Sequence, residues 1–306
     1  AHRFDGIVLL GSCDKIVPGM LMAAARLNLP AIFLNGGPMY PARYHGKDYD
    51  GNIVTEAIGW KQRGEIDSRE FLKIENLAEP CVGSCAMLGT ANTMGMVAEA
   101  LGMSLPGCAA TPAVDARRMQ AGYETGRAIM KLVEREITAR QVITEESIEN
   151  AIALIMATGG STNAIMHLQA IHREAGLGDL PLSRFDEFSR RIPQIASVYP
   201  ASPYDMVDFY HAGGVPAVMA ELEPMLHLDC MTCTCETVGV ELQKAERSKM
   251  REVIRTAEAP FSETGGVAVL GGNLAPLGAV VKPAAVPEHL LKFKGKARVF
   301  QSEQEA

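Results

Sequence analysis

The chain has 306 residues, of which 47% are hydrophobic and 21% are charged, and its formal net charge is -7. This length and apolar content suffice for a large buried core and allow one to three domains of ~100–200 residues each. The mildly acidic composition without a basic stripe argues against a nucleic-acid-binding protein, and no apolar run reaches the ~18–20 residues that a membrane span needs.

The start of the chain predicts a strand, a loop, a helix and a second strand. The apolar run Phe4–Leu10 is typical of a short buried strand, and Pro18 suits the first turn of the helix that follows. The helix is expected to end near Asn28 and to lead into a strand over Ala31–Leu34. Apolar strands that alternate with helices indicate a mostly parallel sheet covered on both faces, which is a three-layer α/β/α fold.

The later part of the chain is predicted to be helical first and rich in strands afterwards. Residues 40–80 are more polar and predict a loop with one or two helices. Further helices are expected over 90–101, 116–137 and 145–157, and the last of them breaks at 158–163 and resumes to 175. Short apolar runs between Gly and Pro turns predict strands at 265–270, 278–282 and 297–300. We therefore expect an α/β/α core over 1–258 and the beginning of a β-rich second domain over 259–306.

Two cysteines stand in Gly/Ser loops just before predicted helices. Cys13 lies in Gly11-Ser12-Cys13-Asp14-Lys15, and Cys85 lies in Cys81-Val82-Gly83-Ser84-Cys85. The thiolate is the form of cysteine that binds metals, and a helix N-terminus favours its negative charge. Both cysteines are therefore candidate metal ligands, and the alternative is that each is a small apolar side chain of the core.

Asp14, Lys15 and the segment Thr158-Gly159-Gly160-Ser161-Thr162-Asn163 are candidate binding groups. Asp14 is a candidate Mg²⁺ ligand, with helix capping as its alternative. Lys15 is a candidate for binding an anionic substrate or for chemical modification, with a solvated surface lysine as its alternative. Ser161, Thr162 and Asn163 follow two glycines and open a helix, so they are candidate substrate-binding residues in an anion cradle. A plain junction between two helices is the alternative.

The other cysteines give weaker signals. The segment Cys230-Met231-Thr232-Cys233-Thr234-Cys235 has no second Cys/His pair at zinc-finger spacing, so we interpret it as a strand and keep a zinc module as the alternative. An odd number of seven cysteines at uneven spacing does not suggest a secreted disulfide scaffold and favours the cytoplasm. The chain begins without Met or a signal peptide, and we expect it to belong to a longer protein.

Several motifs occur together in a fixed order. They are Cys13-Asp14-Lys15-x-x-Pro18-Gly19-x-x-Met22-Ala23, Gly36-Gly37-Pro38-Met39, Gly83-x-Cys85-x-Met87-x-x-Thr90-Ala91-Asn92-Thr93-Met94, Thr158-Gly159-Gly160-Ser161-Thr162-Asn163 and Gly272-Asn273-Leu274-Ala275-Pro276-x-Gly278-Ala279. This set resembles the dihydroxy-acid dehydratase and sugar-acid dehydratase family along essentially the whole chain.

The resemblance implies a hydro-lyase that removes water from a 2,3-dihydroxy acid and yields a 2-keto acid. It implies an iron–sulfur cluster, either [2Fe-2S] or [4Fe-4S], and a nearby Mg²⁺. By motif, Cys13 and Cys85 would be cluster ligands and Asp14 a Mg²⁺ ligand. Lys15 matches a lysine that the family carries as a carbamate, whose oxygen also binds Mg²⁺. The resemblance further implies a β-barrel-like second domain and a homodimer.

The substrate and the completeness of the site are separate questions. The run Ile16–Asn28 favours the branch that serves branched-chain amino acid biosynthesis, whereas Tyr40, Tyr44 and His45 keep an aldonate or 6-phosphogluconate dehydratase open. A non-catalytic homologue is a further alternative. In the family, a third cluster cysteine and a Mg²⁺-binding aspartate lie before the first motif, and a glutamate and the base serine lie after the last. We therefore expect that this chain alone completes neither the cluster nor the reaction, and the catalytic base stays unassigned.

Overall fold

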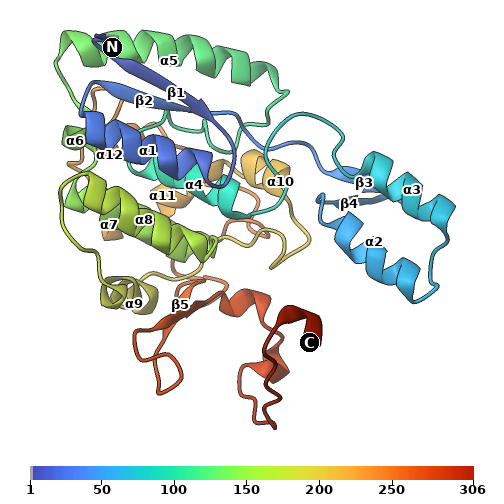
Figure 1. Ribbon diagram of the computed structural model, residues 1–306. Helices are drawn as coiled ribbons and strands as arrows, with labels where there is room; N and C mark the ends of the chain where they lie inside the picture. The colour runs from blue at the N-terminus through green and yellow to red at the C-terminus, as the bar shows by residue number, and fades with distance from the viewer. Residues whose placement is uncertain (1–2) are drawn as a thin grey trace.

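The computed structural model describes residues 3–306 and shows a mixed α/β chain (Figure 1). The helices are α1 (Ile16–Leu27), α2 (Ile53–Gln62), α3 (Ser68–Leu77), α4 (Thr90–Ala100), α5 (Ala116–Glu134), α6 (Ala139–Val142), α7 (Glu145–Thr158), α8 (Asn163–Glu174), α9 (Leu182–Arg191), α10 (Met206–His211), α11 (Gly214–Glu221) and α12 (Val238–Leu242). The strands are β1 (Ile7–Gly11), β2 (Ala31–Asn35), β3 (Ala42–Tyr44), β4 (Lys47–Tyr49), β5 (Ala268–Leu270) and β6 (Ala279–Val281). Short 3-10 helices cover Glu223–Met225, Pro283–Ala285, Glu288–Leu290 and Glu303–Glu305.

The β1–α1–β2 unit at the start of the chain agrees with the prediction. The two strands are parallel, with Ile7 opposite Ala31 and Gly11 opposite Asn35. A parallel pair needs a crossover connection, and α1 supplies it. In Figure 1 the strand pair lies between α5 on one side and α1 on the other. Both strands therefore end at the same edge, where the loop that carries Cys13 begins.

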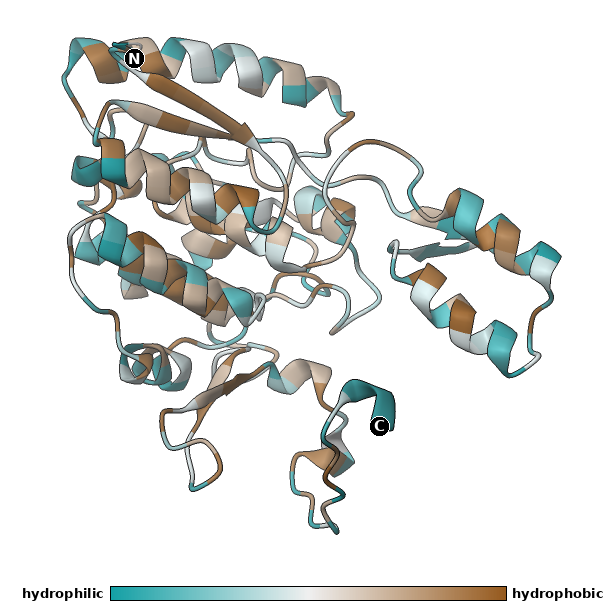
Figure 2. Cartoon of the chain, viewed as in Figure 1, coloured by the Kyte–Doolittle hydropathy of each residue, from teal (hydrophilic) through white to brown (hydrophobic). Residues whose placement is uncertain are grey.

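The hydrophobic core is centred on α7. Every residue of this helix from Ser147 to Thr158 is buried, and α4, α8, α9 and α11 pack around it. The Thr144 side chain accepts a hydrogen bond from the Ser147 N–H at the start of α7, and Gly159, at a φ of 61°, ends it. Figure 2 shows that β1 and β2 are also mostly apolar, whereas the C-terminal end of the chain is hydrophilic. In the described part of the chain, no helix is both long and apolar enough to cross a membrane.

The sheets of the described residues are small. Besides β1–β2 there are two antiparallel pairs, β3–β4 and β5–β6. The β3–β4 pair forms a side lobe with α2 and α3, and this lobe has its own small apolar core (Figure 1). Residues 3–306 contain no closed barrel, and the strand predicted at 297–300 is wrong, because these residues are exposed and pair with no strand in the described structure.

The strand predicted over 230–235 is also wrong. Met231 makes a single bridge to Thr237, and the chain turns between them, with Cys235 at a φ of 65°. A left-handed residue interrupts the extended backbone that a strand requires. Cys233 and Cys235 are nevertheless buried in one apolar cluster, while the hydroxyls of Thr232 and Thr234 donate to the Glu241 carboxylate at 2.6 and 2.7 Å.

The buried carboxyl group of Glu99 in α4 predicts a pH-dependent stability. It accepts hydrogen bonds from the N–H groups of Gly107 and Ala109 at 2.6 and 2.8 Å, and burial raises the pKa of Glu99 to about 8. Because this folded-state pKa exceeds the unfolded value of ~4.3, the folded state holds a proton that the unfolded state loses between these two pH values. The free energy of unfolding should therefore fall as pH rises from about 5 to about 8, by up to ~1.4 kcal/mol per pH unit.

Glu99→Gln keeps a hydrogen-bond acceptor and does not titrate, so this variant should lose that part of the slope. Urea unfolding of both proteins across this pH range measures the difference. Equal pH dependence of the free energy of unfolding in the wild type and the variant would contradict the raised pKa of Glu99.

Candidate active site

The loop between β1 and α1 carries three of the predicted site residues. Cys13 and Lys15 are exposed and Asp14 is half-buried. The Cys13 thiol lies 3.7 Å from one Asp14 oxygen, and the Lys15 ammonium donates to the other at 3.2 Å. This hydrogen bond from Lys15 lowers the pKa of Asp14, which keeps the carboxylate ionised. Within the described structure no side chain caps α1, so Asp14 does not have the capping role that was its alternative.

A second set of hydrogen bonds brings the other cysteine loop to the same edge. The Gly36 N–H, just after β2, donates to the Gly11 carbonyl at 2.9 Å. The Ser84 N–H then donates to the Gly37 carbonyl at 2.9 Å, and the Met39 N–H donates to the Ser84 carbonyl at 2.8 Å. These contacts form a short parallel bridge between residues 38 and 84. The segment before Cys85 is therefore fixed to the chain that leaves β2.

Cys13 and Cys85 consequently lie in the same region. Cys13 and Gly83 line one cavity of ≈ 850 Å³. Neither thiol is in a disulfide, and both cysteines are exposed to solvent. Partial loss of hydration nevertheless raises the pKa of Cys85. The negative charge of Asp50 raises it further, and the charges of Glu79 and Cys13 do so more weakly. The Cys85 thiol therefore stays protonated near neutral pH unless a cation stabilises its thiolate.

Asn92, at the beginning of α4, holds the Cys85 loop in shape. Its amide nitrogen donates to the carbonyls of Cys85 and Met87 at 2.6 and 2.7 Å, and its amide oxygen accepts from the Ser84 hydroxyl at 2.8 Å. Asn92 is buried, so these three bonds are shielded from water. The backbone around the Cys85 thiol is therefore fixed before any ligand binds.

The predicted substrate-binding segment meets the beginning of α4. The Thr90 hydroxyl lies 2.8 Å from the Ser161 hydroxyl and accepts a hydrogen bond from the Asn163 amide at 2.9 Å. The Ser161 N–H donates to the Thr93 hydroxyl at 3.0 Å. Ser161, Thr162 and Asn163 therefore lie beside the helix that follows the Cys85 loop.

The N-terminal ends of α1, α4 and α8 gather around these loops. Arg26, near the end of α1, pairs with Glu174, the last residue of α8, at 2.5 and 2.7 Å. Because both helices have 12 residues and lie side by side (Figure 1), they also begin at about the same level. Three partial positive charges therefore point to the region of Cys13, Asp14 and Lys15. Such an arrangement favours a small anion, for example a carboxylate.

Comparison with known proteins supports the resemblance found in the motifs. The family model described as Dihydroxy-acid/6-phosphogluconate dehydratase N-terminal matches residues 1–241. The chain belongs to the dihydroxy-acid/6-phosphogluconate dehydratase family. The C-terminal model of this dehydratase family matches residues 252–306. The family predicted from the motifs is therefore confirmed.

Curated relatives of this chain are named dihydroxy-acid dehydratase. The relative from Caldanaerobacter subterraneus subsp. tengcongensis is 49% identical over 308 residues. The relatives from Moorella thermoacetica and Pyrococcus furiosus are each 48% identical, over 308 and 307 residues. Each comparison covers 100% of this chain and 55% of the relative, so the chain spans about half the length of these proteins.

The residues predicted as metal ligands do not make up a complete metal site in the described structure. Within residues 3–306 no group of three or more His, Cys, Asp or Glu side chains could hold a metal ion. Cys81 accepts a hydrogen bond from the Tyr40 N–H at 3.3 Å, and the cysteines at 108, 230, 233 and 235 are buried, so none of them joins Cys13 and Cys85. Two free thiols beside an acid–amine pair fit a portion of the ligand set that the resemblance implies.

Two buried polar side chains near the site were missed by sequence reasoning. Asp50 follows β4, and its turn contacts the Cys85 loop through the Asn52 amide, 3.1 Å from the Met87 sulfur. His167 lies on α8, and the charges of Lys15 and Asp14 shift its pKa. In the described structure one oxygen of Asp50 and Nε2 of His167 are buried without a hydrogen-bond partner. The only sequence signal for His167 was its position four residues, about one helical turn, after Asn163.

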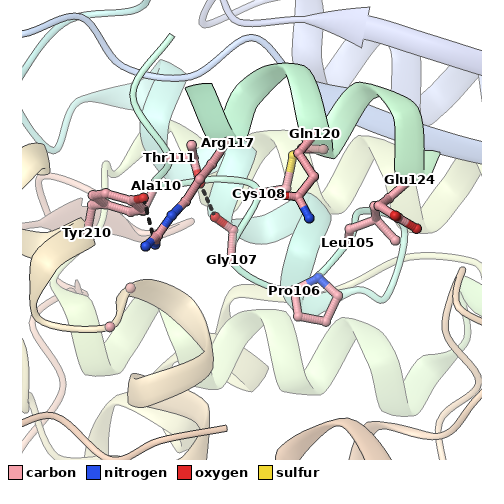
Figure 3. Close-up of a pocket in the computed structure, with 13 residues that line it drawn as sticks. Leu105, Pro106, Gly107, Cys108, Ala110, Thr111, Arg117, Gln120, Glu124 and Tyr210 are labelled. Atoms are coloured by element: carbon pink, nitrogen blue, oxygen red, sulfur yellow. Dashed lines mark hydrogen bonds between the residues drawn. The ribbon is translucent and has the colours of Figure 1, made fainter. Parts of the chain in front are cut away.

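A second cavity, of ≈ 380 Å³, lies between the start of α5 and the turn from α10 to α11 (Figure 3). Arg117 donates to the Tyr210 hydroxyl at 3.0 Å across its mouth, and Cys108 and Gln120 contribute to its wall. None of the site residues predicted from the sequence lines this cavity. It is therefore separate from the candidate active site.

Proposed function

We propose that the protein dehydrates a 2,3-dihydroxy carboxylic acid to a 2-keto acid, as a dihydroxy-acid dehydratase of branched-chain amino acid biosynthesis. The observation that carries this proposal is the meeting of two cysteine loops at one sheet edge, next to Asp14 and Lys15 and to three helix N-termini. Family membership and the name that the relatives share support it.

The donor types at this edge fit an iron–sulfur cluster and Mg²⁺. Cys13 and Cys85 would hold the cluster, and Asp14, with Lys15 as a carbamate, would hold Mg²⁺. When bound, these groups supply a Lewis acid for the 3-hydroxyl leaving group and positive charge for the enolate that forms.

The residues of the chain bind and orient the acid. The helix N-termini attract the substrate carboxylate. Ser161, Thr162 and Asn163 offer hydroxyl and amide groups to the substrate hydroxyls. Removal of the C2 proton requires a base, which we assign to no residue of 3–306.

A direct assay tests the proposed activity. The protein at its full native length, reconstituted anaerobically with iron, sulfide and Mg²⁺, should form 2-keto acid from dihydroxyisovalerate faster than from pentonates, hexonates or 6-phosphogluconate. The alternative substrate class rested partly on Tyr44, whose hydroxyl donates to Glu70 within the side lobe and is therefore already engaged. Preference for a sugar acid would overturn the substrate assignment, and no turnover of any of these acids would overturn the reaction.

We also propose the remaining architecture and context of the protein. A three-layer α/β/α core with a mostly parallel sheet would occupy 1–258, and a β-rich, barrel-like domain would begin at 259. The β1–β2 pair between α5 and α1, the β5–β6 hairpin and the C-terminal family match from residue 252 support this division. The protein would act as a homodimer in the cytoplasm, on a small molecule and without a nucleic-acid or membrane partner.

A further inference from the structure

His167 is a buried histidine without a partner for one ring nitrogen. His167 is 6% exposed, and its Nε2 has no hydrogen-bond partner in the described structure. Burial is the main cause that lowers the pKa of His167. The positive charge of Lys15 lowers it further, and the negative charge of Asp14 opposes this shift. The ring is therefore neutral and has one nitrogen that can accept a hydrogen bond. A buried nitrogen without a hydrogen-bond partner is destabilising, so a partner for Nε2 would stabilise the site.

The geometry of α1 and α8 indicates which side chain can supply that partner. The two helices begin at the same level, with Lys15 immediately before α1 and His167 as the fifth residue of α8. Side chains on a helix lean toward its N-terminus, so the His167 ring leans back toward the level of Lys15. Lys15 and Asp14 are the charged groups that act on the His167 ring, and of these two only the Lys15 ammonium can donate a hydrogen bond to Nε2.

Lys15 is free to move because its present contact is weak. Its ammonium pairs with the adjacent Asp14 at 3.2 Å, and the two side chains are 62% and 45% exposed. An exposed pair of this kind is held only weakly, because water competes for both charged groups. Any other partner of Asp14, such as the cation of the proposed function, would compete with Lys15 for the same carboxylate.

We propose that His167 is a positioning residue for Lys15, whose Nζ donates a hydrogen bond to His167 Nε2 when it leaves Asp14. The bond is available to an ammonium and to a carbamate alike, because the carbamate nitrogen keeps one hydrogen. The inference deepens the proposed function by giving Lys15 a fixed second position, and it rests on that function only for the identity of the cation at Asp14.

Nitrogen NMR of the histidine side chains tests the inference without metal, substrate or turnover. Asp14→Asn removes the charge that holds Lys15, and in this variant we expect the His167 signals of a ring protonated at Nδ1 and accepting at Nε2. Adding Lys15→Met should abolish that signature. His172 is the matched control on the same helix, because its ring nitrogens lie 2.7 Å from Glu145 and 3.0 Å from the Gly178 carbonyl, away from Lys15. A His167 spectrum that does not change when Lys15 is replaced would overturn the proposal.

The reactivity of Lys15 gives a second readout that a purely structural role would not change. In the Asp14→Asn background, His167→Leu should increase acylation of Lys15 several-fold relative to Lys73, as measured by mass spectrometry. His167→Gln, whose amide oxygen can accept from Nζ, should restore the lower rate, and His172→Gln should leave it unchanged. Equal rates in all four proteins would contradict the proposal. Since neither readout requires dehydration, failure of the proposed activity and failure of this inference are distinguishable.

Discussion

Gly83→Ala is expected to destabilise the protein by ~1–3 kcal/mol and to release the Cys85 loop. Gly83 has a φ of 138°, and a Cβ at this position would lie 2.4 Å from the Met39 nitrogen and 2.7 Å from the Pro38 carbonyl carbon. Both contacts are with backbone atoms, which cannot rotate away as a flexible side chain could. The two segments would have to separate, and the hydrogen bonds that Ser84 makes with Gly37 and Met39 would weaken.

Gly64→Ala is the matched control for this variant. Gly64 also has a positive φ, of 74°, but a Cβ there would meet no atom within 4 Å. It should therefore show only the conformational cost, ~1 kcal/mol. Urea unfolding measures the free energies, and the rate of Cys85 modification by a thiol reagent measures the release of the loop. A faster Cys85 reaction only in the Gly83 variant is the expected result, and indistinguishable behaviour of the two variants would refute the role of the backbone contact.

Cys85→Ser is expected to abolish stable iron and sulfide binding in the full-length protein after anaerobic reconstitution. The thiolate is the cluster ligand in iron–sulfur proteins, and a serine hydroxyl is a poor substitute for it near neutral pH. Cys81→Ser is the matched control, because Cys81 lies four residues earlier in the same loop and is only partly buried. Iron and sulfide analysis should show a loss in the first variant and wild-type content in the second. Retention of full iron content by Cys85→Ser would remove Cys85 from the ligand set.

The part of the fold that local patterns determine could be predicted from the sequence. The apolar run before residue 11, Pro18 in the first turn of α1 and Gly159 after α7 determine the boundaries of their elements through backbone sterics. Residues 230–235 and 297–300 show the opposite case. Their alternation of side chains is typical of a strand, but a strand also requires a partner, and Cys235 in the left-handed region turns the chain instead.

The candidate site could be predicted in its parts but not in its assembly. The types and spacing of Cys13, Asp14 and Lys15 indicated metal chemistry because all three are adjacent in the chain. Their proximity to Cys85 depends on hydrogen bonds between Gly37 and Ser84, which are 47 residues apart and belong to no periodic pattern. His167 belongs to no motif of the sequence, and only the packing of α8 against α1 reveals its relation to Lys15.

Thiol cross-linking within one chain is the most direct test of the claim that the two cysteine loops form one site. In a Cys81→Ser variant, Cys13 and Cys85 are the exposed thiols of the described chain, since the cysteines at 108, 230, 233 and 235 are buried. Treatment with a short bis-maleimide, followed by proteolysis and mass spectrometry, identifies the residues that are joined. We predict one intrachain link between Cys13 and Cys85 in most molecules at low protein concentration. Modification of both thiols without any such link would show that the loops do not meet.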